Sequence, residues 1–240
     1  MSLAQPMSAR EVYLKTRKVP DLFWNLYVCR PIAAVLVDVL KNTRVTPNQI
    51  TMSALVVATV ASLILLAVPG WLGLVLGILV FEFSYVLDCA DGMLARLRGT
   101  ASPTGHLLDF LMDEIKAFIL LAAVAARLFL ERQEPRFLLI GLFGLVALAS
   151  GVALTTFIRR PEVAGPAVKG EERARRGPLA LVEGLAKFVI HYPSYIWLAA
   201  ALGRIDFYFY PYVVVNGLYA ARALLSVALR FARFEPSPRA

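Results

Sequence analysis

Long apolar runs separated by short polar connectors dominate the chain. Six runs approach the roughly 20 residues that a helix needs to cross about 30 Å of hydrocarbon at 1.5 Å per residue. The connectors between them carry glycine, proline or charged residues. The pattern therefore predicts an all-α, polytopic membrane protein with six transmembrane helices, over residues 50–68, 71–95, 104–126, 137–158, 179–202 and 208–229.

A shorter, mixed segment precedes the first run. Residues 22–41 combine Trp24 and Tyr27 with the apolar stretch 32–37 and with charged residues such as Arg30. The segment is too short and too interrupted to span, and it is typical of an amphipathic helix in the membrane interface, although a soluble cap packed on the bundle would fit as well. We expect three regions, namely a cytoplasmic N-terminus with this helix (1–45), a six-helix membrane domain (46–232) and a cytoplasmic tail (233–240).

Composition and charge support a membrane protein. The chain has 59% apolar and 18% charged residues. Soluble domains average roughly 45–50% apolar and 25% charged residues. The net charge of +8 does not indicate nucleic-acid binding, because the basic residues lie between apolar runs. Eighteen Lys and Arg lie on the side of the termini and four on the other. By the positive-inside rule, we expect a multi-pass protein of the inner (cytoplasmic) membrane, with both termini and the active site cytoplasmic and no nucleic-acid partner.

Acidic residues flank the connector between the second and third runs. Asp88 and Asp91 are three residues apart, and Asp109 and Asp113 are four apart, so each pair shares one helix face. Because the connector 96–103 is short, we expect the two helices to be antiparallel neighbours. The four carboxylates should then meet in one pocket, about 10 Å below the connector.

Four carboxylates in a low-dielectric site repel one another, and protonation or bound cations must relieve the repulsion. Oxygen ligands suit Mg²⁺ or Mn²⁺, and two such ions would balance four charges and could clamp a phosphoryl displacement. Small residues beside the aspartates, Gly92, Ala95 and Gly105, leave room for a nucleotide, and Arg96 is placed to meet a diphosphate. Ion-paired helix ends would not require this regular spacing.

The acidic segment resembles the signature of the CDP-alcohol phosphotransferase family, D-x2-D-G-x2-A-R-x8-G-x3-D-x3-D. Every fixed position is present, as Asp88, Asp91, Gly92, Ala95, Arg96, Gly105, Asp109 and Asp113. A second family element, T-P-N-x-hydrophobic-T, is matched by residues 46–51. The resemblance implies six spans, an interfacial helix and a homodimer.

The resemblance also implies roles for individual residues. Asp88, Asp91 and Asp109 would hold two metal ions, with Asp88 and Asp109 bridging them. Asp113 would contact the second ion and act as the catalytic general base on the acceptor hydroxyl. The residues that would contact the CDP moiety are Asn48, Thr51, Gly92, Arg96 and Ser102.

Basic residues farther along the chain are candidates for binding the acceptor. They are Arg159, Arg160, Lys187 and His191. Glu183, Lys187 and His191 recur every four residues, a spacing that fits an internal ion pair equally well. The basic residues between 159 and 176 also fit an orientation signal that contacts anionic lipid.

These observations predict a transferase of phospholipid biosynthesis. It would move a phosphatidyl-type group from a CDP-linked lipid, such as CDP-diacylglycerol, to a small polar alcohol and release CMP. An alternative with the same chemistry uses CDP-choline or CDP-ethanolamine as donor and diacylglycerol as acceptor. An alternative of another class is an intramembrane cation transporter, but the sequence lacks the acidic residues near mid-membrane and the paired interrupted helices that this class predicts.

Overall fold

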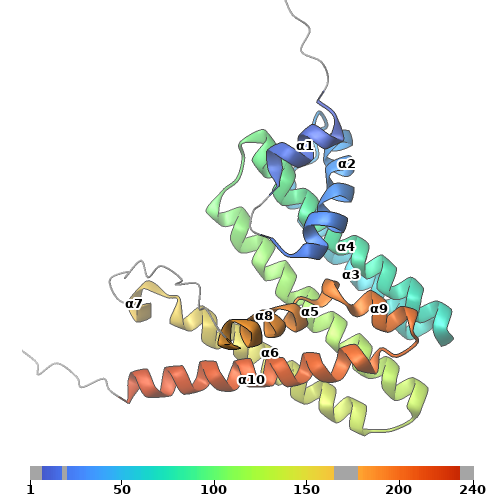
Figure 1. The fold of residues 1–240 in the computed structure, drawn as a ribbon, viewed down its shortest axis with the longest axis vertical. Helices are drawn as coiled ribbons and strands as arrows, with labels where there is room; N and C mark the ends of the chain where they lie inside the picture. The colour runs from blue at the N-terminus through green and yellow to red at the C-terminus, as the bar shows by residue number, and fades with distance from the viewer. Residues whose placement is uncertain (1–6, 18–20, 165–177, 233–240) are drawn as a thin grey trace, which may run out of the picture.

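A computed structural model of the chain describes residues 7–17, 21–164 and 178–232, and the regular structure of these residues is helical (Figure 1). This confirms the all-α class. The predicted tail, 233–240, lies outside the described residues. The elements are α1 (Ala9–Thr16), a π-helical turn (Asn25–Cys29), α2 (Arg30–Leu40), α3 (Pro47–Ala67), α4 (Gly70–Arg98), α5 (Pro103–Arg132), α6 (Arg136–Ile158), α7 (Pro161–Ala164), α8 (Pro178–Ile190), η2 (Tyr192–Ser194), α9 (Ile196–Ala201) and α10 (Asp206–Phe231).

Four helices of the described residues, α3, α4, α6 and α10, are long and apolar enough to cross a membrane. They coincide with four of the six predicted runs. The third run lies in α5, a helix of 30 residues that also carries charged side chains along its length. The integral membrane character is therefore supported, while the count of six spans is not confirmed.

The fifth predicted run, 179–202, is not one continuous helix. Helix α8 ends at Ile190, a 3₁₀ turn follows at Tyr192–Ser194, and α9 begins at Ile196. Pro193 lies inside the turn, where it has no N–H to donate and restricts the backbone of the residue before it. The interruption places His191 at the junction of the two helices.

Local capping fixes the helix ends near the acidic residues. Thr46 caps α3 in a capping box with Gln49. Ser102 caps α5, and its hydroxyl accepts a hydrogen bond from the Gly105 N–H at 3.0 Å. Gly99 ends α4 at φ +65°, in the left-handed region that favours glycine.

The N-terminal segment packs along α4. Trp24 Nε1 donates to Glu82 Oε2 of α4 at 3.2 Å. Helix α2 buries its Ala33 and Val37 side chains and leaves Val35 and other apolar side chains exposed. The segment thus packs on the bundle and also presents an apolar surface, so it has features of both readings of residues 22–41. Helix α1 was not predicted, although its S-x-x-E capping box, Ser8 to Glu11, is visible in the sequence.

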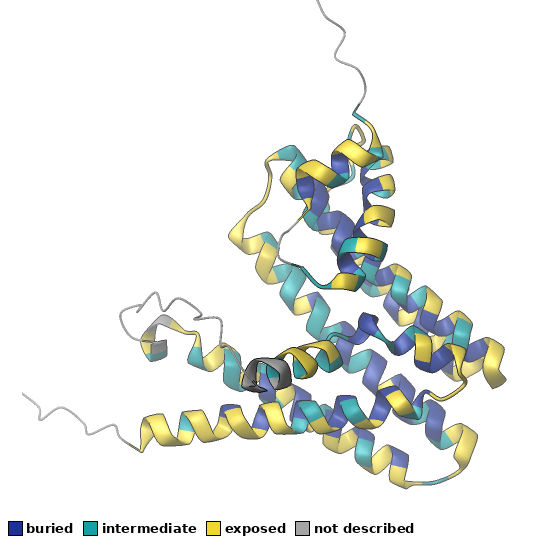
Figure 2. Cartoon of the chain, viewed as in Figure 1, coloured by how far each residue is buried: buried dark blue, intermediate teal, exposed yellow. Residues whose placement is uncertain are grey.

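Helix α5 joins two groups of helices. It packs against α3, which also packs against α4, and against α6, which pairs with α10. Figure 2 shows buried residues along the inner faces and exposed residues on the outer faces of these helices. Many of the exposed side chains are large and apolar, as expected of surfaces that face lipid: Leu63, Leu72, Leu139, Phe143 and Leu218. The two cysteines, Cys29 and Cys89, are buried and free.

One buried arginine closes the end of the bundle far from α1. The Arg127 guanidinium, 2% exposed, donates to the carbonyl oxygens of Leu65 at 2.6 Å, Val68 at 3.0 Å and Gly70 at 2.5 Å. Carbonyls at a helix C-terminus have no partner within their own helix. Arg127 of α5 therefore satisfies the end of α3 and the connector to α4.

We expect Arg127→Met to lower the stability of the protein by about 3 kcal/mol, because it removes the donor of the buried Leu65 carbonyl and of the part-buried carbonyls of Val68 and Gly70. For a protein of this size, the melting temperature in detergent should fall by roughly 6–12 °C. Arg132→Met, which removes an exposed arginine of the same helix, is the matched control. Equal melting temperatures for the two variants would contradict this role of Arg127.

Candidate functional site

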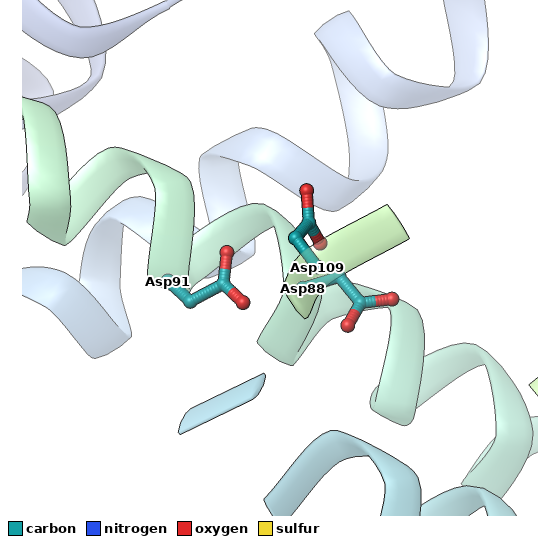
Figure 3. A group of neighbouring side chains, drawn as sticks. All are labelled: Asp88, Asp91 and Asp109. Carbon is teal, nitrogen blue, oxygen red and sulfur yellow. The ribbon is translucent and has the colours of Figure 1, made fainter. Parts of the chain in front are cut away.

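Three aspartates lie together between α4 and α5. One carboxylate oxygen from each of Asp88, Asp91 and Asp109 lies within 4.8 Å of the other two (Figure 3). Asp91 is 4% exposed and Asp88 is 9% exposed, so these charges are largely withdrawn from solvent. Asp88 and Asp91 come from adjacent turns of α4, and Asp109 comes from α5. The structure thus brings together three of the four predicted metal ligands.

Asp113 is connected to this group through a lysine. Lys116 Nζ forms an ion pair with Asp88 Oδ2 and lies 2.8 Å from Asp113 Oδ1. The second contact is an ion pair in which Asp113 Oδ1 makes no hydrogen bond. Four residues advance a helix by about 6 Å, so Asp113 lies one turn beyond Asp109. The close group among the described residues contains three aspartates, and the expectation that Asp113 joins them in one group is not confirmed.

The helix arrangement explains this difference. Helix α5 packs its backbone against α3 and α6 rather than closely against α4. The expectation that the second and third runs are close antiparallel neighbours is therefore wrong in this detail. Side chains, above all those of Lys116 and the aspartates, bridge the space between α4 and α5. Lys116 was not predicted as a site residue, although it follows Asp113 by three residues and therefore lies on nearly the same face of α5.

The acidic group fits a divalent cation. Asp88 Oδ1 is buried and has no hydrogen-bond partner among the described residues. Asp91 Oδ2 accepts a hydrogen bond from Thr51 Oγ1, which fixes the direction of that carboxylate. An unpartnered buried oxygen beside two further carboxylates offers the hard oxygen ligands that Mg²⁺ and Mn²⁺ prefer. The donors present can therefore hold the predicted cation.

A cavity of about 490 Å³ opens beside the acidic group, where α3 and α5 begin and α4 ends. Its volume lies in the range of small-molecule sites. Asp91 and Asp109 form part of its wall. All five residues predicted to contact the CDP moiety line this cavity: Asn48, Thr51, Gly92, Arg96 and Ser102.

Two arginines of α4 connect this cavity to the N-terminal segment. Arg96 Nε donates to the carbonyl of Thr16, at the end of α1, at 3.0 Å. Arg98 donates to carbonyls of the connector between α2 and α3, at Leu40 (2.7 Å), Thr43 (2.9 Å) and Val45 (2.5 Å). A Cβ atom at Gly92 would lie 3.3 Å from Arg96 Nη1, so a side chain there would crowd the guanidinium. Arg98 was not predicted, because its role depends on a distant connector.

A second cavity, of about 590 Å³, is bordered by Asp113. Three of the four candidate acceptor residues, Arg159, Lys187 and His191, line it. Arg160 does not line this cavity and is exposed in the turn after α6. Adjacent residues at a helix end point in different directions, so the two arginines do not share one site. The predicted lipid-contacting residues Lys169, Arg173, Arg175 and Arg176 lie outside the described residues.

His191 is held at the interruption between α8 and α9. Its Nε2 lies 2.7 Å from the Tyr85 hydroxyl of α4, and its Nδ1 lies 2.6 Å from Ser194 Oγ. The predicted stripe of residues 183, 187 and 191 thus places two polar side chains, Lys187 and His191, at the wall of the second cavity.

Comparisons with known proteins agree with this geometry. A family model described as CDP-alcohol phosphatidyltransferase matches residues 44–204, a region that contains the three aspartates and the whole lining of the first cavity. The archaetidylinositol phosphate synthase of Aeropyrum pernix is 27% identical over 175 residues, which cover 71% of this chain and 81% of that protein.

We expect the purified protein to bind Mn²⁺ and Asp91→Asn to weaken this binding by at least about tenfold, because the change removes a charged oxygen ligand. Electron paramagnetic resonance of free Mn²⁺ measures the affinity directly. Asp206→Asn is the control, because Asp206 pairs with Arg204 at 2.9 Å in a different part of the molecule. The cation assignment fails if the Asp91 and Asp206 variants bind Mn²⁺ equally well.

Proposed function

The chain belongs to the CDP-alcohol phosphatidyltransferase family, and from this we propose that it transfers a phosphatidyl-type group from a CDP-linked lipid to a small polar alcohol and releases CMP. CDP-diacylglycerol is the proposed donor lipid. The observation that carries the proposal is that the acidic group and the first cavity share Asp91 and Asp109. A nucleotide in that cavity would bring its diphosphate beside the cation ligands.

The first cavity has the polarity that a nucleoside diphosphate requires. Helices α3 and α5 both begin at its wall, and a helix N-terminus carries partial positive charge that favours phosphate. In this proposal Arg96 pairs with the diphosphate, and Asn48 and Ser102 bind the cytidine part through their polar atoms. Thr51, hydrogen-bonded to Asp91, couples nucleotide binding to the orientation of a metal ligand.

We assign Asp88, Asp91, Asp109 and Asp113 as ligands of two Mg²⁺ or Mn²⁺ ions. Lys116 offsets one of their four negative charges, and the substrate diphosphate adds further negative charge, so two divalent ions suit the loaded site. When bound, these ions would neutralise the diphosphate and stabilise the charge that develops on the departing CMP oxygen.

Asp113 is placed to serve as the general base. It borders the second cavity and follows Asp109, which borders the first, by one helical turn. A hydroxyl of an acceptor in the second cavity would give its proton to Asp113 as its oxygen attacks the lipid-linked phosphorus. A new bond forms between the acceptor oxygen and phosphorus, and the bond from that phosphorus to the CMP oxygen breaks.

The second cavity favours a polar acceptor that carries a phosphate or an acidic group. Arg159 and Lys187 contribute two positive charges to a wall that also holds the acidic Asp113 and Glu114, and His191 adds a further polar group. In the alternative with CDP-choline or CDP-ethanolamine as donor, the acceptor is diacylglycerol, which would place an uncharged lipid against these residues. The name of the Aeropyrum pernix relative, which makes archaetidylinositol phosphate, supports a phosphorylated acceptor.

We extend the proposal to membrane orientation and assembly. The unequal distribution of Lys and Arg supports an inner-membrane protein with both termini and the site on the cytoplasmic side. The family resemblance supports a homodimer. Access from the cytoplasm for CDP and from the bilayer for acyl chains would then bring a lipid donor and a soluble acceptor together.

We expect Asp113→Asn to lower the turnover number for metal-dependent CMP release by at least about 100-fold, because the amide cannot take the acceptor proton. The KM for CDP-diacylglycerol should change far less, since Asp113 does not line the first cavity. Release of CMP from CDP-diacylglycerol with a panel of alcohols measures both, with Asp206→Asn as the control. Turnover close to that of the wild type would eliminate Asp113 as the base.

We expect Lys187→Met to raise the KM for a phosphorylated acceptor by about tenfold and to change the KM for its unphosphorylated analogue little. Suitable pairs are glycerol 3-phosphate with glycerol and inositol phosphate with inositol. Arg160→Met is the matched control, because Arg160 does not line the second cavity. Faster CMP release from CDP-choline with diacylglycerol than from CDP-diacylglycerol with any alcohol would instead favour the alternative in which diacylglycerol is the acceptor.

A further inference from the structure

We propose that Lys116 is a positioning residue of the acidic group. Lys116 holds Asp88 and Asp113 by one oxygen each and supplies part of the positive charge when no divalent ion is bound. The inference rests on the metal site of the proposed function. It assigns to a residue outside the family signature a role in orienting a metal ligand and the general base.

The burial of Lys116 is the first observation. The side chain is 0% exposed although it carries an ammonium group in the middle of α5. A buried charge is stable only when it is paired and hydrogen-bonded. Lys116 finds one partner on its own helix, Asp113, and one across the gap on α4, Asp88. An ordinary lysine three residues after an aspartate would instead extend into solvent.

The distribution of partners over the carboxylate oxygens is the second observation. Lys116 engages Asp88 through Oδ2, and Asp88 Oδ1 is buried without a hydrogen-bond partner among the described residues. One oxygen of this carboxylate is thus fixed by the chain and the other is left for a cation. Groups that hold a metal ligand from behind set its direction and tune the metal. Lys116 has this relation to Asp88.

Two effects of removing the ammonium can be separated. Charge repulsion between Lys116 and a nearby divalent ion weakens metal binding, so its removal should strengthen that binding in a low-dielectric site. Loss of orientation at Asp113 should lower the rate of proton transfer. A lysine that only ties α4 to α5 would change stability alone, by the same amount with and without metal.

The test compares Lys116→Met, Lys116→Arg and the wild type as full-length protein in detergent. Thermal unfolding is measured in a chelator and in Mg²⁺, and the Mn²⁺ affinity is measured by paramagnetic resonance. Arg127→Met is the matched control, because it removes another buried base of α5, whose partners are backbone carbonyls and Glu131 rather than the acidic group. CMP release is the final readout.

Without metal, Lys116→Met should melt well below the wild type, because Asp88 and Asp113 lose their counter-ion. Mg²⁺ should then raise its melting temperature by roughly 5 °C more than it raises that of the wild type or of Arg127→Met. Lys116→Met should bind Mn²⁺ about tenfold more tightly than the wild type. Its turnover number should fall at least about tenfold with a nearly unchanged KM for CDP-diacylglycerol, and Lys116→Arg should retain the wild-type Mn²⁺ affinity within about threefold.

The contrary results are distinct. Mn²⁺ binding by Lys116→Met that equals or falls below that of the wild type overturns the inference, as does a Mg²⁺ response equal to that of Arg127→Met. A wild-type protein that binds no Mn²⁺ overturns the proposed metal site itself. If Lys116→Met does not fold, the double variant Lys116→Met with Asp113→Asn removes one charge of each sign. Recovery of metal-free folding by this variant supports the counter-ion role, and failure to recover counts against it.

Discussion

Carboxylates that share a poorly hydrated space can be ionised together only when positive charge lies among them. This constraint governs the region between α4 and α5, where Asp88, Asp91 and Asp109 meet. The chain itself supplies one positive charge there, from Lys116, and leaves a buried oxygen of Asp88 without a hydrogen-bond partner. Protonation or a cation from outside has to balance the remaining negative charge. This uncompensated charge lies at the same place where the proposed chemistry needs a divalent cation.

The two cavities border consecutive turns of α5. Asp109 lines one cavity and Asp113 the other, and four residues separate them by about 6 Å along the helix. In the proposed reaction, a donor in one cavity and an acceptor in the other would approach one phosphorus atom without sharing a binding surface. The first cavity also depends on the N-terminal segment, because Arg96 and Arg98 connect its wall to α1 and to the connector before α3. The segment before residue 46 is therefore part of the site's support and not merely an anchor.

The sequence predicted what fixed spacing on one helix determines. The all-α class followed from local pattern, and the clustering of Asp88, Asp91 and Asp109 followed from their spacing and the short connector between their helices. The residues expected to contact the CDP moiety came from the family resemblance, and they line the first cavity, where α4 ends and α3 and α5 begin. Contacts between distant segments were not predictable in this way. Spacing places Lys116 on a helix face but does not say that it reaches α4, and nothing local indicates that Arg98 binds carbonyls of the connector at 40–45. Pro193 is present in the sequence, but the fifth run was assigned from hydropathy alone and was therefore predicted as one continuous helix.

Helix α5 contains two fully or almost fully buried bases whose chemistry is not interchangeable. Arg127 faces three carbonyl oxygens spread over the end of α3 and the connector after it, and a planar guanidinium with five donors can reach several of them at once. Lys116 faces two carboxylates, and a compact ammonium can lie between them while each keeps its second oxygen. One base thus closes the far end of the bundle permanently, whereas the other is adjacent to a place where charge changes when ions and substrate bind. The distinction between a structural and a functional buried charge follows here from the place of the partners. Arg127 contacts backbone carbonyls and the Glu131 carboxylate at the far end of the bundle, whereas Lys116 contacts two carboxylates that are proposed metal ligands.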